Sequence, residues 1–265
     1  TVTHTLTTAP TAGCLSESDN IVVNFTPAPV VNINSVPEVC ANNSIVTLNG
    51  TVSNATGGIW SNVNGTFSGG ATGLVNNDYS PTNPEIAFGS VTFILTSTGQ
   101  GNCLPVQDSR TVTIIEAPVV DAGTDQTVCA NNANIALSGT VTTDPGGNGG
   151  PGTGQWSTSG TGSFANTNNL NTTYTPSAAD IAAGTVDITL TSTLNGLCLG
   201  ASDVITLTIV PSPVVDAGPA TVDICANNAI TSLTGSITFS SGVPPPGLWT
   251  TSGSGTFADP TNPNN

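Results

Sequence analysis

Basic side chains are almost absent from this sequence of 265 residues. Lys+Arg amount to 1 and Asp+Glu to 16, so the formal net charge is -15 at pH 7. A protein binds a phosphate backbone through clustered Lys and Arg, and here Arg110 stands alone. Nucleic acids and anionic membrane surfaces are therefore not expected as partners.

Histidine is equally scarce, which restricts the catalytic chemistry. His4 is the only histidine, and no lysine is present to act as a base or to form a Schiff base. Acyl-transfer triads and histidine-based metal sites are therefore not expected. The composition still permits a pair of carboxylates, as in a carboxylate-dependent hydrolase or its accessory domain. Because the acidic residues are scattered and recur with an internal repeat, we predict that the chain is not an enzyme.

Long apolar runs and helix-forming residues are also missing. No apolar stretch approaches the roughly 18 residues that a membrane-spanning helix requires, so membrane insertion is not expected. Thr, Val and Ile are abundant among 30 Gly and 19 Pro, a mixture typical of strands and turns. The alternation of Val186, Ile188 and Leu190 favours a folded core over disorder. We expect an all-β protein with almost no helix.

The sequence repeats itself with a period close to the size of one domain. The segment PVV begins at Pro29, Pro118 and Pro213, which gives separations of 89 and 95 residues. An immunoglobulin-like sandwich has roughly 100 residues, so each period fits one such domain. We predict tandem immunoglobulin-like β-sandwich repeats in a linear array, with whole repeats at residues 29–117 and 118–212.

The flanking segments correspond to parts of the same repeat. Residues 1–28 match the closing strands, with Leu6 opposite Leu95, and residues 213–265 match the opening part. Two interpretations remain open. The sequence is either a window on a longer array or a subunit whose last sandwich is completed by the first strands of a neighbour, through strand addition. In both, the expected partners are copies of the chain or adjoining repeats.

Each opening part carries one tryptophan in a Gly-rich line. The three residues are Trp60, Trp156 and Trp249. An immunoglobulin-like sandwich buries such a ring between its sheets, so we predict core positions. The alternative is an exposed row of rings that binds glycans. His4 falls on an inward position of its strand and is predicted to be a partly buried structural residue.

Aspartates also recur at equivalent positions: Asp19, Asp108 and Asp203 precede the last strand of their repeats. We predict turn residues there, because Asp closes hairpins through its own backbone. Calcium is the second interpretation, since Asp121 and Asp125 lie near a repeat junction and could join Asp108 and Asp203 as ligands. No other cofactor is expected.

The six cysteines fall into two repeated classes. Those early in the repeat, within VCANN or ICANN, are Cys40, Cys129 and Cys225, and those in the hairpin before the last strand are Cys14, Cys103 and Cys198. Regular spacing without a CxxC motif indicates disulfides rather than zinc. Either Cys129 pairs with Cys198 inside one repeat, or Cys40 pairs with Cys198 across a junction. The second alternative assigns the remaining cysteines to adjoining repeats or neighbouring subunits.

The line VVDAGTDQTVCANNANIALSGTV, followed by GQWSTSGTGSFA and YTPSAADIAAGTVDITLTST, resembles a known repeat type. It is similar to the PKD-like and immunoglobulin-like repeats of very large Bacteroidota surface proteins, including adhesins associated with gliding motility and type IX secretion. The first whole repeat departs from it, reading VVNINSVPEVC. The resemblance implies export to the cell surface and a role as stalk, adhesin or filament, with no catalytic residues.

Two non-enzymatic functions follow from these observations. The first is structural: a rod of β-sandwiches, stiffened by Pro-containing linkers and junction bridges, that extends a surface appendage or filament. The second is a binding module for a glycan or a surface. Its candidate loops are TTDPGGNGGPGTG at residues 142–154 and SSGVPPPG at residues 240–247.

Overall fold

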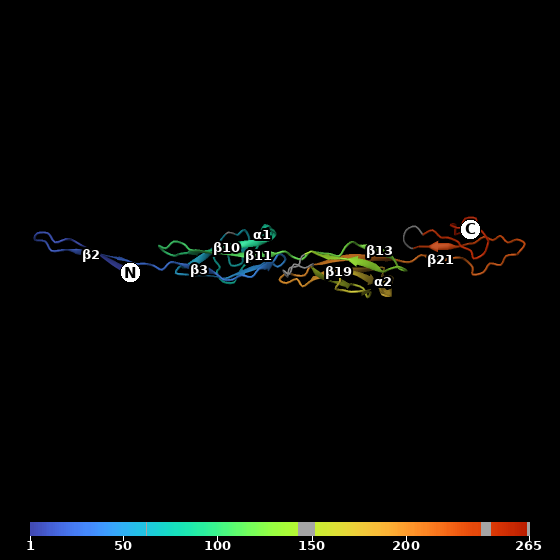
Figure 1. Ribbon diagram of the computed structural model, residues 1–265, viewed down its shortest axis with the longest axis horizontal. Coiled ribbons are helices and arrows are strands. Elements are labelled where there is room, and N and C mark those ends of the chain that lie inside the picture. Colours follow the sequence, from blue (N-terminus) through green and yellow to red (C-terminus); the bar gives the residue numbers. More distant parts are fainter. Residues whose placement is uncertain (62, 143–151, 240–244, 264–265) are drawn as a thin grey trace. The chain divides into compact units, whose positions relative to one another are not determined.

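The computed structural model describes residues 1–61, 63–142, 152–239 and 245–263. They form two compact units, Thr1–Ala117 with Leu197–Leu199, and Pro118–Gly196 with Gly200–Asn265. Strands and turns make up nearly all of both units (Figure 1). The chain is all-β and consists of immunoglobulin-like repeats, as the sequence predicts. The candidate binding loops fall largely on residues 143–151 and 240–244, outside the described residues.

The first sandwich, Val30–Ile115, has two layers of strands. One is a sheet of order β4-β11-β10-β7, in which β4 runs parallel to β11 and the other neighbours are antiparallel. The other layer holds the sheet β5-β9-β8 and the pair β3-β6. The strands are β3 (Val30–Ile33), β4 (Val39–Cys40), β5 (Val46–Leu48), β6 (Gly50–Ser53), β7 (Gly57–Ser61), β8 (Thr66–Phe67), β9 (Asn77–Ser80), β10 (Ser90–Thr98) and β11 (Gln107–Ile115).

The second sandwich, Val120–Val210, repeats this arrangement. Its four-stranded sheet has the order β13-β20-β19-β16, again with one parallel pair, β13 with β20. The facing layer holds β14-β18-β17 and the pair β12-β15. The strands are β12 (Val120–Asp121), β13 (Gln126–Cys129), β14 (Ile135–Ser138), β15 (Thr140–Val141), β16 (Thr153–Thr158), β17 (Ser163–Phe164), β18 (Asn171–Thr175), β19 (Thr185–Thr193) and β20 (Ser202–Val210).

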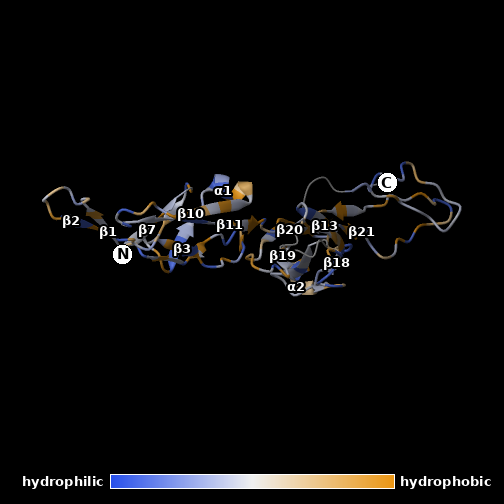
Figure 2. Ribbon diagram, turned by 60° about the vertical axis from the view of Figure 1, so that its left-hand side comes forward, coloured by the Kyte–Doolittle hydropathy of each residue, from blue (hydrophilic) through white to orange (hydrophobic). Residues whose placement is uncertain are grey.

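Strict alternation along the long strands produces the two cores. In β10 and β19 every second residue is buried, and hydrophobic residues are distributed along the ribbons of both sandwiches (Figure 2). Successive strand residues face opposite sides of a sheet, so one face packs inward while the Thr-rich face meets solvent. Trp60 and Trp156 are 3% and 2% exposed and belong to the first and second core, respectively. The predicted core positions of these two rings are confirmed, and a glycan-binding row is wrong for them.

Two short helices precede β10 and β19, where almost no helix was expected. They are α1 (Asn83–Phe88) and α2 (Ala178–Ala183). Each begins at a capping box, Thr82 with Glu85 and Ser177 with Asp180, whose side chains and backbone N–H groups bond reciprocally. Each ends at a glycine in the left-handed region that only glycine adopts without strain. The motifs T-x-x-E and S-x-x-D are the sequence signals for these helices.

The N-terminal hairpin pairs β1 (Val2–Thr7) with β2 (Ser18–Val23). All residues of both strands are exposed, including His4, so the predicted burial of this histidine is wrong. The cause is that no described strand covers the apolar face of the hairpin.

The C-terminal segment, residues 213–263, pairs β21 (Val214–Asp216) with β22 (Ser236–Thr238). Trp249 is only half-buried there, so its predicted core position is wrong in this structure. Within the described residues, the segment has no strands equivalent to β10 and β11, whose side chains bury Trp60 in the first sandwich.

Candidate functional site

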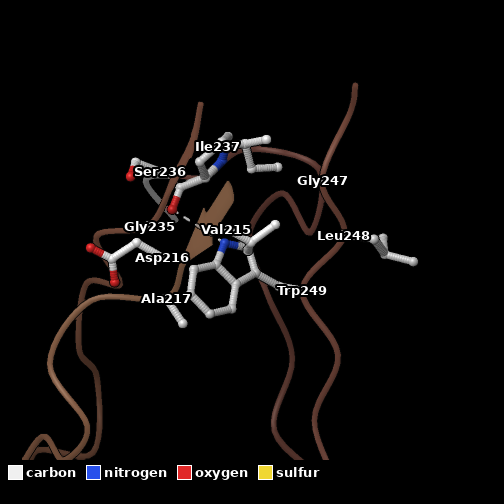
Figure 3. Close-up of a pocket in the computed structure, with 10 residues that line it drawn as sticks. Val215, Asp216, Ala217, Gly235, Ser236, Ile237, Gly247, Leu248 and Trp249 are labelled. Atoms are coloured by element: carbon white, nitrogen blue, oxygen red, sulfur yellow. Dashed lines mark hydrogen bonds between the residues drawn. The ribbon is translucent and has the colours of Figure 1, made fainter. Parts of the chain in front are cut away.

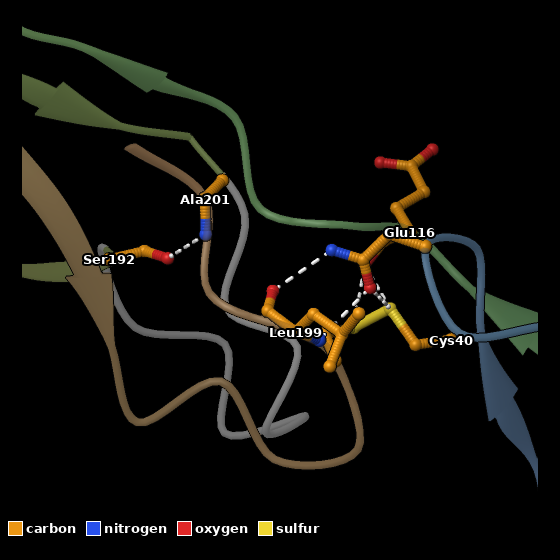
Figure 4. The surroundings of a disulfide bond; sticks show 7 residues. Cys40, Glu116, Ser192, Leu199 and Ala201 are labelled. Atoms are coloured by element: carbon orange, nitrogen blue, oxygen red, sulfur yellow. Dashed lines mark hydrogen bonds between the residues drawn. A yellow bond between two sulfur atoms is a disulfide. The ribbon is translucent and has the colours of Figure 1, made fainter. Parts of the chain in front are cut away.

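A disulfide joins Cys40, at the end of β4, to Cys198 in the hairpin between β19 and β20 (Figure 4). The Cα atoms are 5.0 Å apart, within the range that a bridge requires. The tripeptide Leu197–Leu199 accordingly belongs to the first compact unit. Of the two pairings that the sequence left open, the structure shows Cys40 with Cys198, and a Cys129–Cys198 bridge is wrong.

Hydrogen bonds from the CANN turn hold the bridged hairpin in place. The side-chain amide of Asn42 donates to the carbonyl oxygen of Leu199 at 2.9 Å, and its oxygen accepts the N–H of Leu199 at 3.0 Å. The backbone carbonyl of Glu116 lies 3.5 Å from the Sγ atom of Cys198. Beyond the junction, the hydroxyl of Ser192 accepts the N–H of Ala201 at 2.9 Å and fixes the base of the hairpin.

The other cysteines have no disulfide partner within the described residues. Cys14 and Cys225 are exposed, whereas Cys103 and Cys129 are partly covered. The Sγ atom of Cys129 lies 4.0 Å from the carbonyl of Pro211, as the Sγ atom of Cys40 lies 3.9 Å from that of Glu116. The surroundings of Cys40 are therefore repeated at Cys129. The disulfide roles predicted for these four residues stay a prediction.

The recurring aspartates lie inside strands, so the predicted turn role is wrong. Asp108 is part of β11 and Asp203 of β20. The Oδ2 atom of Asp108 accepts the N–H of Ile33 at 2.7 Å, and that of Asp203 accepts the N–H of Ala122 at 2.8 Å. Each carboxylate therefore ties the last strand of its sandwich to the first strand. Sequence reasoning missed this role.

The remaining calcium candidates also bond to backbone groups. The Oδ1 atom of Asp121 accepts the N–H of Gly123, and that of Asp125 accepts the N–H of Thr206, both at 2.8 Å. In the part of the chain that the structure describes, no three His, Cys, Asp or Glu side chains gather as a metal site would require. Calcium binding by Asp108, Asp121, Asp125 and Asp203 stays a prediction.

A tyrosine bonded to a carboxylate is a second feature that sequence reasoning missed. In the second sandwich the hydroxyl of Tyr174 donates to Asp180 at 2.8 Å, and the N–H groups of Thr161 and Ser177 donate to the same carboxylate at 2.9 Å. Burial alone raises the pKa of Asp180, but these hydrogen bonds outweigh it and lower the pKa from 3.8 to about 2. The carboxylate is therefore a structural anchor that stays charged.

The first sandwich contains the same network with a longer carboxylate. The hydroxyl of Tyr79 donates to Glu85, which also accepts the N–H groups of Asn64 and Thr82. Burial, together with the hydrogen bond and charge of Glu85, raises the pKa of Tyr79 to about 12. The hydroxyl therefore remains a donor throughout the physiological range.

Replacing Asp180 by asparagine is expected to lower the free energy of unfolding by about 1–3 kcal/mol, because one buried N–H donor then faces the amide NH₂. The substitution should also make the free energy of unfolding depend less on pH in the acid range. A folded-state pKa below the unfolded value stabilises the fold above about pH 4, and this contribution is lost as the pH falls through about 2. Urea unfolding of both proteins between pH 2 and pH 5 measures the difference. The matched control is Asp223→Asn at an exposed carboxylate, and equal slopes in all three proteins would contradict the role of Asp180.

The half-buried Trp249 lines a pocket in the C-terminal segment. Gly235, Ile237 and Gly247 form other parts of its wall (Figure 3). The indole N–H of Trp249 donates to the carbonyl of Asn262 at 3.0 Å, as Trp60 and Trp156 donate to carbonyls also 13 residues further on. The ring is therefore held as in the whole sandwiches, while its apolar face remains open.

No protein-family model and no curated protein matches this sequence. Similar solved structures are tandem sandwich domains. Protocadherin gammaB7 EC3-6 is 13% identical with a TM-score of 0.36, and the match covers 90% of this chain and 67% of that one. The insect immune protein hemolin is 9% identical with a TM-score of 0.38, and the match covers 79% of this chain and 56% of that one. Titin I67–I69 is 12% identical with a TM-score of 0.35, and the match covers 79% of this chain and 76% of that one. The chain spans 60% and 46% of two similar protocadherin gamma B2 fragments.

Proposed function

We propose that this chain is a non-enzymatic structural region of an extracellular surface protein, in which β-sandwich repeats act as a stiff spacer within a stalk, adhesin or filament. The supporting observation is the bridge between Cys40 and Cys198, because it ties a residue of the first sandwich to the closing hairpin of the second. A covalent tie there limits bending of the chain at Glu116 and Ala117. A flexible linker would serve a spacer less well.

The bridge also supports the extracellular location. Disulfides persist in oxidising compartments and are rare in the cytosol. The resemblance to exported Bacteroidota repeats agrees with that location. Among the described residues, no helix has the length and apolar character to cross a membrane.

The composition supports a passive role. In the second sandwich β16 exposes the uncharged Thr153, Gln155 and Ser157, and Asp187 is the one charged residue of β19. The carboxylates of Asp108, Asp180 and Asp203 hold backbone N–H groups in place. Catalytic carboxylate pairs instead need two acids that face one substrate. The structural proposal is therefore preferred to a hydrolase.

Small-angle X-ray scattering of the oxidised polypeptide tests the spacer. A compact chain of this length has a radius of gyration of about 18 Å, whereas two sandwiches of 30–40 Å in line, with the N-terminal hairpin and the C-terminal segment at their ends, give roughly 30 Å. We expect the larger value, with greater flexibility in Cys198→Ser. A radius near 18 Å would contradict the proposal, and specific binding on a glycan array would favour the binding module.

A further inference from the structure

The hairpin tip Leu197–Leu199 is bound to the first sandwich by more than its disulfide. The side-chain amide of Asn42, in the CANN turn at residues 40–43, donates to the carbonyl oxygen of Leu199 and accepts its N–H. An asparagine side chain carries both donors and an acceptor, so these two bonds fix the orientation of the tip as well as its distance. The tip therefore docks on the turn with its cysteine directed toward the cysteine of the turn.

A backbone carbonyl that follows β11 brings the two sulfur atoms together. The carbonyl oxygen of Glu116 lies 3.5 Å from the Sγ atom of Cys198 and 3.9 Å from that of Cys40 (Figure 4). A cysteine thiol is a weak hydrogen-bond donor, and a carbonyl oxygen has two lone pairs. In the reduced protein both thiols can therefore donate to this one oxygen, which holds the sulfur atoms close to each other before they are joined.

The same contact occurs at two cysteines that have no disulfide partner within the described residues. The Sγ atom of Cys103 lies 3.7 Å from the carbonyl oxygen of Pro27, and that of Cys129 lies 4.0 Å from the carbonyl oxygen of Pro211. Pro27, Glu116 and Pro211 each stand two residues before a PVV segment. Because the carbonyl holds a tip cysteine or a turn cysteine without any bridge, the fold itself sets the position of the sulfur atoms.

The CANN turn likewise has its final conformation without a tip. The N–H of Asn132 donates to the carbonyl of Cys129 at 2.8 Å, and in the docked turn the N–H of Asn43 donates to the carbonyl of Cys40 at 2.9 Å. In both turns the alanine donates its N–H, at 2.8 Å, to the last residue of the neighbouring strand, β20 or β11. The turn is therefore a preformed surface that binds a tip without refolding.

Docking also shields the sulfur atoms. Cys40 is 0% and Cys198 8% exposed. A reductant or another thiol has to reach one of the two sulfur atoms, so it attacks this bridge only after the tip leaves the turn. Asn42 itself is exposed, so its side chain can be changed without opening the core of the sandwich.

We propose that the CANN turn is a recognition site for the cysteine-bearing tip of a closing hairpin, and that Asn42 directs the pairing of Cys40 with Cys198 among the six cysteines. The tip docks first, through the amide of Asn42 and the carbonyl of Glu116, and oxidation follows within the docked pair. Docking and bridging then stabilise each other by the same factor. This role of Asn42 rests on the spacer function proposed above, because the bridge that it directs is the one that stiffens the chain.

The covalent step is a dithiol oxidation by a disulfide. One cysteine thiolate attacks oxidised glutathione and releases one glutathione thiol, and the second cysteine attacks this mixed disulfide and releases the other. The two cysteines lose two protons and two electrons, one S–S bond forms, and one glutathione disulfide becomes two thiols. Docking accelerates the second attack, because it holds the two sulfur atoms within reach of each other.

Refolding of the reduced polypeptide in glutathione buffers tests the role of Asn42. The variant is Asn42→Ala, and the matched control is Asn43→Ala, which keeps the backbone N–H that closes the turn. The ratio of bridged to reduced protein gives the effective concentration of the two thiols. We expect it to fall by about tenfold in Asn42→Ala, because two hydrogen bonds of the docked tip are lost, and to stay unchanged in Asn43→Ala.

Peptide mapping after pepsin digestion at low pH measures the pairing itself. We expect Cys40 joined to Cys198 in most of the unaltered polypeptide and of Asn43→Ala, and more bridges from Cys198 to other cysteines in Asn42→Ala. Circular dichroism verifies that all three proteins fold. Equal pairing and equal effective concentrations in the three proteins would overturn the proposal, as would random pairing in the unaltered one.

Amide hydrogen exchange of the fully reduced, unaltered polypeptide provides a test without any substitution. If docking precedes oxidation, the N–H of Leu199 exchanges more slowly than in the unfolded chain although no bridge is present. Exchange as fast as in the unfolded chain would overturn the proposal. The spacer function would still stand in that case, because it requires the bridge however the bridge forms, and it fails separately if the bridged protein scatters as a compact particle.

Discussion

Replacing Trp156 by alanine is expected to lower the free energy of unfolding of the second sandwich by about 3–5 kcal/mol, the range measured when large aromatic side chains are removed from cores. The ring is 2% exposed and packs against Leu190 and Gly139. Its N–H also donates to the carbonyl of Asn169 at 3.1 Å, and the change removes this hydrogen bond as well. Urea unfolding followed by circular dichroism measures the loss.

Trp249→Ala in the same chain is the matched control for that change. The indole makes the equivalent hydrogen bond, but its ring is only half-buried. The substitution therefore removes less buried apolar surface than Trp156→Ala does. We expect the second sandwich to keep its unfolding midpoint. If Trp249→Ala destabilised the monomer as strongly as Trp156→Ala, the open pocket described for the C-terminal segment would be wrong.

Replacing Cys198 by serine is expected to reduce the free energy of unfolding by about 2–5 kcal/mol, because the bridge constrains a long loop of the unfolded chain. Its sequence separation is 158 residues. The hydrogen bonds between Asn42 and Leu199 should weaken as well, because the tip is then free to leave the turn. Calorimetry and amide hydrogen exchange at Leu199 measure both effects.

The control for the bridge is Cys14→Ser, which removes an exposed thiol without a disulfide partner in the described residues. An exposed substitution of this kind changes stability by less than about 0.5 kcal/mol in the monomer. Equal effects of the two serine variants would contradict a stabilising junction. Adding a reductant to the unaltered protein should reproduce the Cys198→Ser result.

Features that depend on local pattern were predictable from the sequence. Alternation in Val186, Ile188 and Leu190 predicted a half-buried strand, and β19 buries all three. The match of residues 1–28 to a closing hairpin predicted the pairing that the structure shows between β1 and β2. Both depend only on side-chain periodicity and on the internal repeat.

Features that depend on which segments meet in space were not predictable. The burial of His4 and Trp249 requires strands that no described residue provides. The sequence repeat placed both residues at inward positions, but their side chains are exposed or half-buried in the structure. The pairing of Cys40 required knowledge of which hairpin reaches the CANN turn. The bond from Tyr174 to Asp180 joins two elements whose proximity becomes evident only in the fold, although the S-x-x-D motif marked the carboxylate.

The bridge between Cys40 and Cys198 also determines how the chain carries tension. A load applied at residues 1 and 263 passes through the sulfur atoms and bypasses the intervening loop, whose ends are 158 residues apart. At 3.3–3.6 Å per residue, roughly 550 Å of contour length is withheld from extension until the bridge is reduced. Only β3 and β4 of the first sandwich and β20 of the second lie on the loaded path, and a reducing environment would release the length that the bridge withholds.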